Sequence, residues 1–209
     1  MDLADVLKRV EASYRGSGSW TDPHEDREVE DAEYSRVTDP DRYRIVGARA
    51  SAWERALVDL GLAAAESARL PDWPYGPRGV SAVRLRPHVA DALELLVVHG
   101  SMESVPDTVI GIGIGSPPVM VAMEPDCGCD ACDSGSADLL DVVDQAFVDV
   151  VSGEILYAEG DGWTLTETHE RSQYTGGINA SAIAASVRRG DSVGTRALIG
   201  RAWLSSPNQ

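Results

Sequence analysis

The sequence predicts an α+β fold, in which N-terminal helices and one central helix pack on an antiparallel sheet. Three observations lead to this prediction. Apolar residues recur at helical spacing before residue 61, alternate at strand spacing between residues 83 and 123, and return to helical spacing from residue 136. The segment 71–77, rich in proline and glycine, separates the first two regions. A run of strands set between helices is typical of an α+β domain.

Two helices are predicted in the first third of the chain. The first spans residues 3–14, whose apolar residues form one stripe. The second is about 20 residues long and ends at Gly61. Thr38 or Asp39 can cap its first turn, where Pro40 costs no hydrogen bond. Between the two helices, the charge-dense residues 22–33 are predicted to form either a solvated helix or a mobile loop.

Alternating residues then predict a sheet of four short strands. These are centred on residues 83–86, 93–98, 110–114 and 119–123. The residues 92–99 also fit a buried helix. In the run 111–116, glycines alternate with isoleucines, which leaves one strand face bare for a close neighbour. This run lacks the spacing and the Gly-Lys-Ser/Thr of a phosphate-binding loop.

The remaining chain is predicted to add a helix from Ser136 that Gly153 ends, and a hairpin that turns at residues 160–162. Two short helices are expected at 179–189 and 191–203. We divide the chain into three parts. They are an N-terminal helix with an acidic segment (1–33), an α+β core (34–168) and a C-terminal helical tail of small residues (169–209).

Composition excludes several classes of protein. The 209 residues carry 18 basic and 34 acidic side chains, a net charge of −16, which opposes binding to nucleic acid. No apolar stretch approaches the roughly 20 residues of a membrane span, and the N-terminus has no signal-peptide pattern. We therefore expect a soluble cytoplasmic protein, whose acidity suits a basic protein partner.

The main candidate site is a cysteine cluster. Cys127, Cys129 and Cys132 are the only cysteines of the chain and form a C-x-C-x-x-C pattern. Such clustering in a cytoplasmic protein indicates metal binding or redox chemistry. Neighbouring aspartates, Asp130 among them, disfavour free thiolates, whereas a bound cation would deprotonate the thiols. Sulfur ligands select zinc. The dipole of the helix from residue 136 could instead lower the pKa of Cys132 unaided.

The zinc hypothesis requires a fourth ligand. His169 is the first candidate, and His99, Asp126 and Asp133 are the alternatives. Three thiolates and one histidine would close the coordination sphere, which makes the zinc structural. Catalysis would need an open position and a general base such as Glu124. Redox thiols and a metal-free structural loop also remain open.

The function predicted from these features is that of a small, non-enzymatic cytoplasmic protein that binds a protein partner and holds a structural zinc at the cysteine cluster. The alternative is an enzyme that uses the same cysteines, either a thiol oxidoreductase or a zinc-dependent hydrolase. No catalytic residue is assigned.

The chain also resembles a family of uncharacterised actinobacterial proteins. The resemblance rests on the C-G-C-D-A-C-D run at 127–133, on the segment 34–43 that opens the long helix, and on Arg84-Leu85. It covers about residues 34–160. The family is a domain of unknown function, so the resemblance implies that the cysteine run is important but implies no activity.

Overall fold

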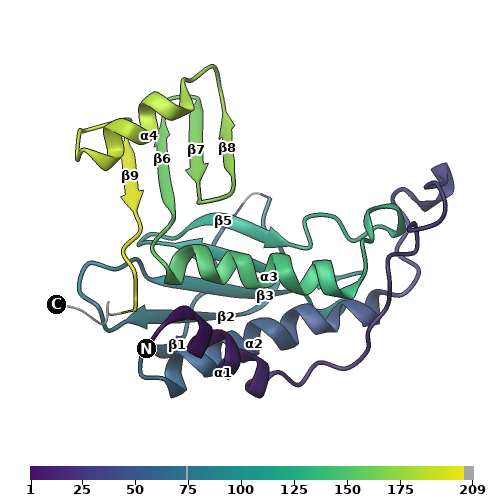
Figure 1. Ribbon diagram of the computed structural model, residues 1–209. Coiled ribbons are helices and arrows are strands. Elements are labelled where there is room, and N and C mark those ends of the chain that lie inside the picture. Colours follow the sequence, from purple (N-terminus) through teal and green to yellow (C-terminus); the bar gives the residue numbers. More distant parts are fainter. Residues whose placement is uncertain (74, 205–209) are drawn as a thin grey trace.

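A computed structural model describes residues 1–73 and 75–204 of the chain. These residues form two antiparallel sheets and four α-helices (Figure 1). The α+β fold class is confirmed. None of the described helices is long and apolar enough to cross a membrane.

The first sheet has five strands in the order β1-β2-β3-β4-β5, each antiparallel to the next. The strands are β1 (Ala63–Ser67), β2 (Arg78–Pro87), β3 (Leu95–Met102), β4 (Val105–Ile114) and β5 (Val119–Glu124). The four predicted strands are therefore confirmed, and the helical alternative for residues 92–99 is wrong. The edge strand β1 was not predicted, because its sequence AAAES carries no strand signal of its own.

Three helices belong to the layer that covers one face of this sheet (Figure 1). They are α1 (Leu3–Ser13), α2 (Arg44–Asp59) and α3 (Ser136–Val151). A 3₁₀ turn (Pro40–Tyr43) precedes α2, and its N-cap residue Asp39 makes no side-chain cap bond. At the centre of this layer, the rings of Trp53 and Phe147 stack with their centroids 5.1 Å apart. Both rings are fully buried, so α2 and α3 share one core with the sheet.

The opposite face of the first sheet is bare where glycines line it. The ring of Trp73 lies against Gly111 and Gly113 of β4. A Cβ atom at Gly113 would lie 2.5 Å from Cζ2 of Trp73, closer than any side chain allows. The indole Nε1 of Trp73 also donates a hydrogen bond to the carbonyl oxygen of Pro118 at 3.2 Å. The prediction that the bare face admits a close neighbour is therefore confirmed.

The second sheet has four strands in the order β8-β7-β6-β9, and the helix α4 (Ala180–Arg188) packs on it. Its strands are β6 (Leu156–Gly160), β7 (Trp163–Glu167), β8 (Ser172–Thr175) and β9 (Arg196–Ile199). The predicted hairpin at 160–162 and the helix at 179–189 are confirmed. The helix predicted at 191–203 is wrong, because residues 196–199 pair with β6 as a strand.

The chain enters and leaves the second sheet at one place. The backbone N–H of Gly200 donates to the carbonyl oxygen of Ile155 at 2.6 Å, and Gly153 lies against the backbone of Arg201 and Ala202. After this crossing, Trp203 returns to the core of the first layer, where its side chain is 1% exposed. The second sheet combines strands from both sides of residue 168. The division of the chain at that residue stays a prediction.

Candidate metal centre

The three cysteines lie in the segment 125–135, here called the Cys loop, which joins β5 to α3. A single 3₁₀ turn (Asp130–Cys132) bends the loop back, and the N–H of Cys132 donates to the carbonyl oxygen of Cys129 at 3.0 Å. The N–H of Asp130 donates to the carbonyl oxygen of Arg36 at 2.7 Å. The loop is thus held both by its own turn and by a segment 94 residues earlier in the chain.

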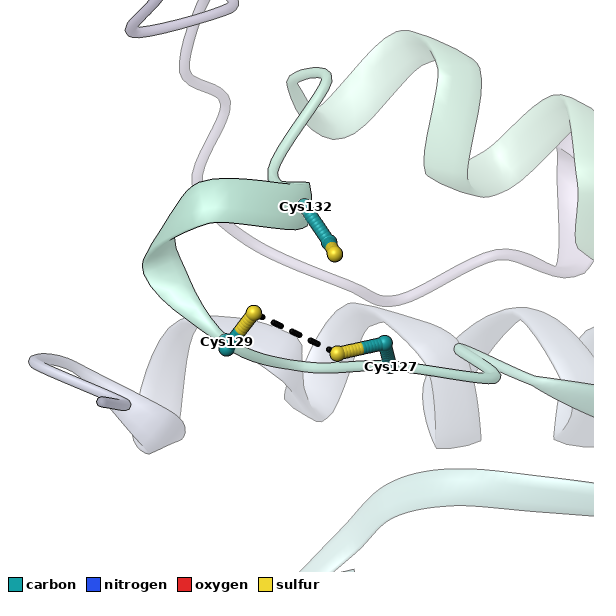
Figure 2. Close-up of side chains that lie close together, drawn as sticks. All are labelled: Cys127, Cys129 and Cys132. Atoms are coloured by element: carbon teal, nitrogen blue, oxygen red, sulfur yellow. Dashed lines mark hydrogen bonds between the residues drawn. The ribbon is translucent and has the colours of Figure 1, made fainter. Parts of the chain in front are cut away.

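The cysteine side chains converge on one point (Figure 2). The Sγ atoms of all three lie within 4.8 Å of one another, and those of Cys127 and Cys129 are 3.3 Å apart. Cys129 is buried, whereas Cys127 and Cys132 are exposed. The cluster therefore lies at the surface of the protein, with one of its three residues buried.

Two of the three aspartates of the loop, Asp130 and Asp133, are paired with other residues. The carboxylate of Asp130 accepts hydrogen bonds from Nε of Arg36 at 2.7 Å and from the backbone N–H of Thr38 at 2.9 Å. Thr38 therefore binds the Cys loop instead of capping α2. The neutralising arginine weakens the repulsion that the sequence predicted between this carboxylate and the thiols.

Asp133 is paired in the same way from the other side. Its carboxylate accepts from Nε1 of Trp20 at 2.8 Å and forms an ion pair with Arg42 at 2.9 Å. The carboxylate also accepts from the N–H of Gly135, at the start of α3. The guanidinium of Arg42 lies over the ring of Trp20. The segment from Trp20 to Arg42 thus clasps the Cys loop through two aspartates.

The thiols titrate as a group rather than singly. Burial acts to raise the pKa of Cys129, but hydrogen bonds from Cys127 and Cys132 favour its thiolate and lower the pKa below the ordinary value. The same hydrogen bond to Cys129, together with that to Cys127 and burial, raises the pKa of Cys132. The net direction for Cys132 is thus opposite to the lowering of its pKa that the helix dipole alone would produce.

The candidates for a fourth ligand lie in different places. His169 lines a pocket with Gly153 and Ile199, beside the second sheet. The ring of His99 is buried in β3, where Nε2 lies 2.9 Å from Oε1 of Glu54. In the described residues, the group of metal-binding side chains within 4.8 Å of one another contains the three cysteines and neither histidine.

Among the aspartate candidates, Asp133 is engaged as above, and Asp126 is exposed next to Cys127. Its carboxylate also lies outside the group of three sulfurs. The fourth ligand stays a prediction.

Residues 10–206 match the model of a family described as "Family of unknown function (DUF6226)". The chain belongs to this family. The match covers the Cys loop, the segment that clasps it and the whole second sheet, and so extends beyond the residues 34–160 that the resemblance covered. No curated protein and no solved structure matches the chain.

The sequence predicted the cysteine cluster but not the residues that hold the loop. Trp20 and Arg42 contact Asp133, more than 90 residues away, and no local spacing reveals such a contact. The only signal was the resemblance that placed the segment 34–43 in the same family as the cysteine run.

Proposed function

We propose that this member of the family is a zinc-binding protein without enzymatic activity, in which the ion fixes the Cys loop. The observation that carries the proposal is the convergence of three Sγ atoms within 4.8 Å of one another. Thiolates are the ligands that favour zinc over magnesium or calcium. Bound zinc would hold Cys127, Cys129 and Cys132 as thiolates and tie the end of β5 to the start of α3.

The paired aspartates support a structural role for the ion. Because Asp130 and Asp133 already bind Arg36 and Arg42, fixing the loop also fixes the segment that begins at Trp20. Metal binding and folding of this segment are then coupled. We extend the proposal to a cytoplasmic location, where thiols stay reduced, and to a basic protein partner, which the net charge of −16 suits. We also propose that the C-G-C-D-A-C-D run marks an actinobacterial branch of the family.

Native mass spectrometry of protein purified without chelator, before and after addition of zinc, tests this proposal. We expect one zinc per chain in the wild type and none in Cys129→Ser, with a lower melting temperature for the variant. A wild-type chain that binds no zinc at micromolar concentrations would overturn it. A wild type and a variant with equal zinc content would do the same.

Two further variants identify the fourth ligand. Loss of zinc affinity in His169→Ala would confirm the ligand predicted from the sequence, and loss in Asp126→Asn would assign the position to the neighbour of Cys127. The matched control is His88→Ala, because the ring of His88 is exposed and binds the carbonyl oxygen of Gly61 instead. Unchanged affinity in both variants leaves the position to water or to a partner.

A thiol oxidoreductase is the second candidate, because the sulfurs of Cys127 and Cys129 are 3.3 Å apart and Cys127 is exposed. Two thiols would reduce a disulfide of a substrate protein, losing two electrons and two protons as they join. Reversible loss of two mass units with a small-molecule disulfide, blocked in Cys127→Ser, would favour this function. Protection of the thiols by zinc would favour the first.

A further inference from the structure

A polar pocket of about 240 Å³ lies at the seam between the two sheets. One wall is the free edge of β5, residues 120–124, followed by Asp126. The other wall comes from the second sheet and consists of Thr166, Arg171 and Gln173. Since β5 is the last strand of its sheet, one side of its backbone has no strand partner among the described residues.

Glu124 is the group of this pocket that most needs a ligand. Its side chain is on the same strand face as that of its register partner Ile110, the face that the helices cover. The residue is 9% exposed, yet no described residue donates a hydrogen bond to its carboxyl group. Burial raises the pKa of Glu124 to about 7, which the charge of Asp126 reinforces and that of Arg171 opposes. The carboxyl oxygens of Glu124 keep some exposure, so a ligand in the pocket can donate a hydrogen bond to them.

Arg171 supplies the opposite charge. It lines this pocket and the neighbouring one against α3, and its charge acts on both Glu124 and Asp149. In the described part of the chain, no carboxylate lies within 4.0 Å of its guanidinium, although many other arginines of the protein form such pairs. A guanidinium fork binds a carboxylate with two parallel hydrogen bonds.

We propose that this pocket binds a small zwitterion, an α-amino acid, whose ammonium group lies at Glu124 and whose carboxylate binds Arg171. At about 240 Å³ the pocket is smaller than the roughly 300–1,000 Å³ of drug-sized sites. It therefore takes a molecule of amino-acid size. Ala122, which lies on the same strand face as Glu124, and Val121 also line the pocket and favour an aliphatic side chain over a charged one. This inference does not require the proposed zinc, although Asp126 lines the pocket and is also a candidate for the fourth ligand.

Isothermal titration calorimetry of the full chain tests the proposal with glycine, L-alanine and L-leucine, and with two leucine analogues that each lack one charge. N-acetyl-L-leucine removes the ammonium and L-leucinamide removes the carboxylate. We expect at least one of the three amino acids to bind in a saturable way. If leucine binds, each of its two analogues should bind at least about tenfold more weakly than leucine. If only alanine binds, the corresponding analogues of alanine should show the same loss. Absence of binding by all three amino acids at millimolar concentration would overturn the proposal. Equal binding of the amide would also overturn it, because it would show a site for simple cations or peptide termini.

Two variants locate the site. Glu124→Gln and Arg171→Gln should each weaken binding at least about tenfold. Their matched controls, Glu25→Gln and Arg69→Gln, change exposed residues outside the pocket and should leave it unchanged. The amide resonances of Thr166 and Gln173 should shift on titration of the wild type. Unchanged affinity in both pocket variants, or shifts confined to another part of the chain, would place the ligand elsewhere and refute the assignment.

Discussion

Replacing Glu124 by glutamine should make the protein more stable at alkaline pH and leave it unchanged at acidic pH. Burial raises the pKa of this carboxyl group from its ordinary value of 4.5 to about 7, with Arg171 acting in the opposite direction and Asp126 adding to the rise. The folded chain therefore holds the proton more tightly than the unfolded chain does. As the pH rises from 4.5 through about 7, the folded state loses stability relative to the unfolded state.

The size of the effect follows from this interval. At about 1.4 kcal/mol for each tenfold change in proton affinity, a rise from 4.5 to about 7 corresponds to about 3 kcal/mol at most. Glutamine has the shape of the protonated acid and does not titrate. The variant should thus be more stable than the wild type by up to about 3 kcal/mol at about pH 8, and equal to it at about pH 4.

Urea unfolding at several pH values, with reductant and chelator present, measures the difference. The wild type and the variant are compared at each pH, so titration of the cysteines cancels. Glu25→Gln is the control, since it makes the same substitution at an exposed residue outside the pocket. A difference between wild type and Glu124→Gln that does not change between about pH 4 and about pH 8 would refute the reasoning.

Two further predictions concern the first sheet. Gly113→Ala should lower the free energy of unfolding by about 1–3 kcal/mol, because the new methyl group would meet the ring of Trp73. The control is Gly177→Ala, since a Cβ atom at Gly177 meets nothing within 4 Å. In thermal unfolding, this control should lose far less stability than Gly113→Ala. For His99, burial lowers the pKa, but the hydrogen bond and charge of Glu54 outweigh it and raise the net value above the ordinary 6.5. The stabilisation is thus complete below about pH 6.5 and is lost as pH rises through the folded-state pKa, and NMR titration should show the midpoint of His99 fall in Glu54→Gln. A midpoint that does not move would contradict this assignment.

The spacing of neighbouring residues in the sequence was enough to predict the helix from residue 136 and the cysteine cluster. The apolar stripe of 136–151 gives one helix face, and the six-residue cysteine run brings three sulfurs together through one turn. Both results depend on residues that are close in sequence. The Trp73 ring on the glycines of β4 was predicted only as an unnamed neighbour, since alternation shows that a face is bare but not what covers it.

Long-range pairing decided the elements that the sequence did not predict. Residues 196–199 become a strand because they pair with β6, almost 40 residues earlier, and this pairing overrides their weak helical preference. The alanine-rich β1 is a strand because β2 lies beside it. The partners of Asp130 and Asp133 lie more than 90 residues away, so the sequence placed these charges beside the thiols without the arginines that neutralise them.

The crossing at Gly153 and Gly200 gives the second sheet the connectivity of an insertion. Because the two connections run side by side, a chain shortened from residue 153 to residue 200 needs only a short linker to close. Ile155 and Tyr157 pack in the core of the first layer, so the shortened chain would have to replace these contacts. It would then be a minimal protein that keeps the Cys loop and lacks the wall of the pocket that the second sheet supplies. Homologues that have gained or lost the second sheet with its helix would be viable for the same reason. In protein engineering, another domain could be inserted between Gly153 and Gly200 in its place.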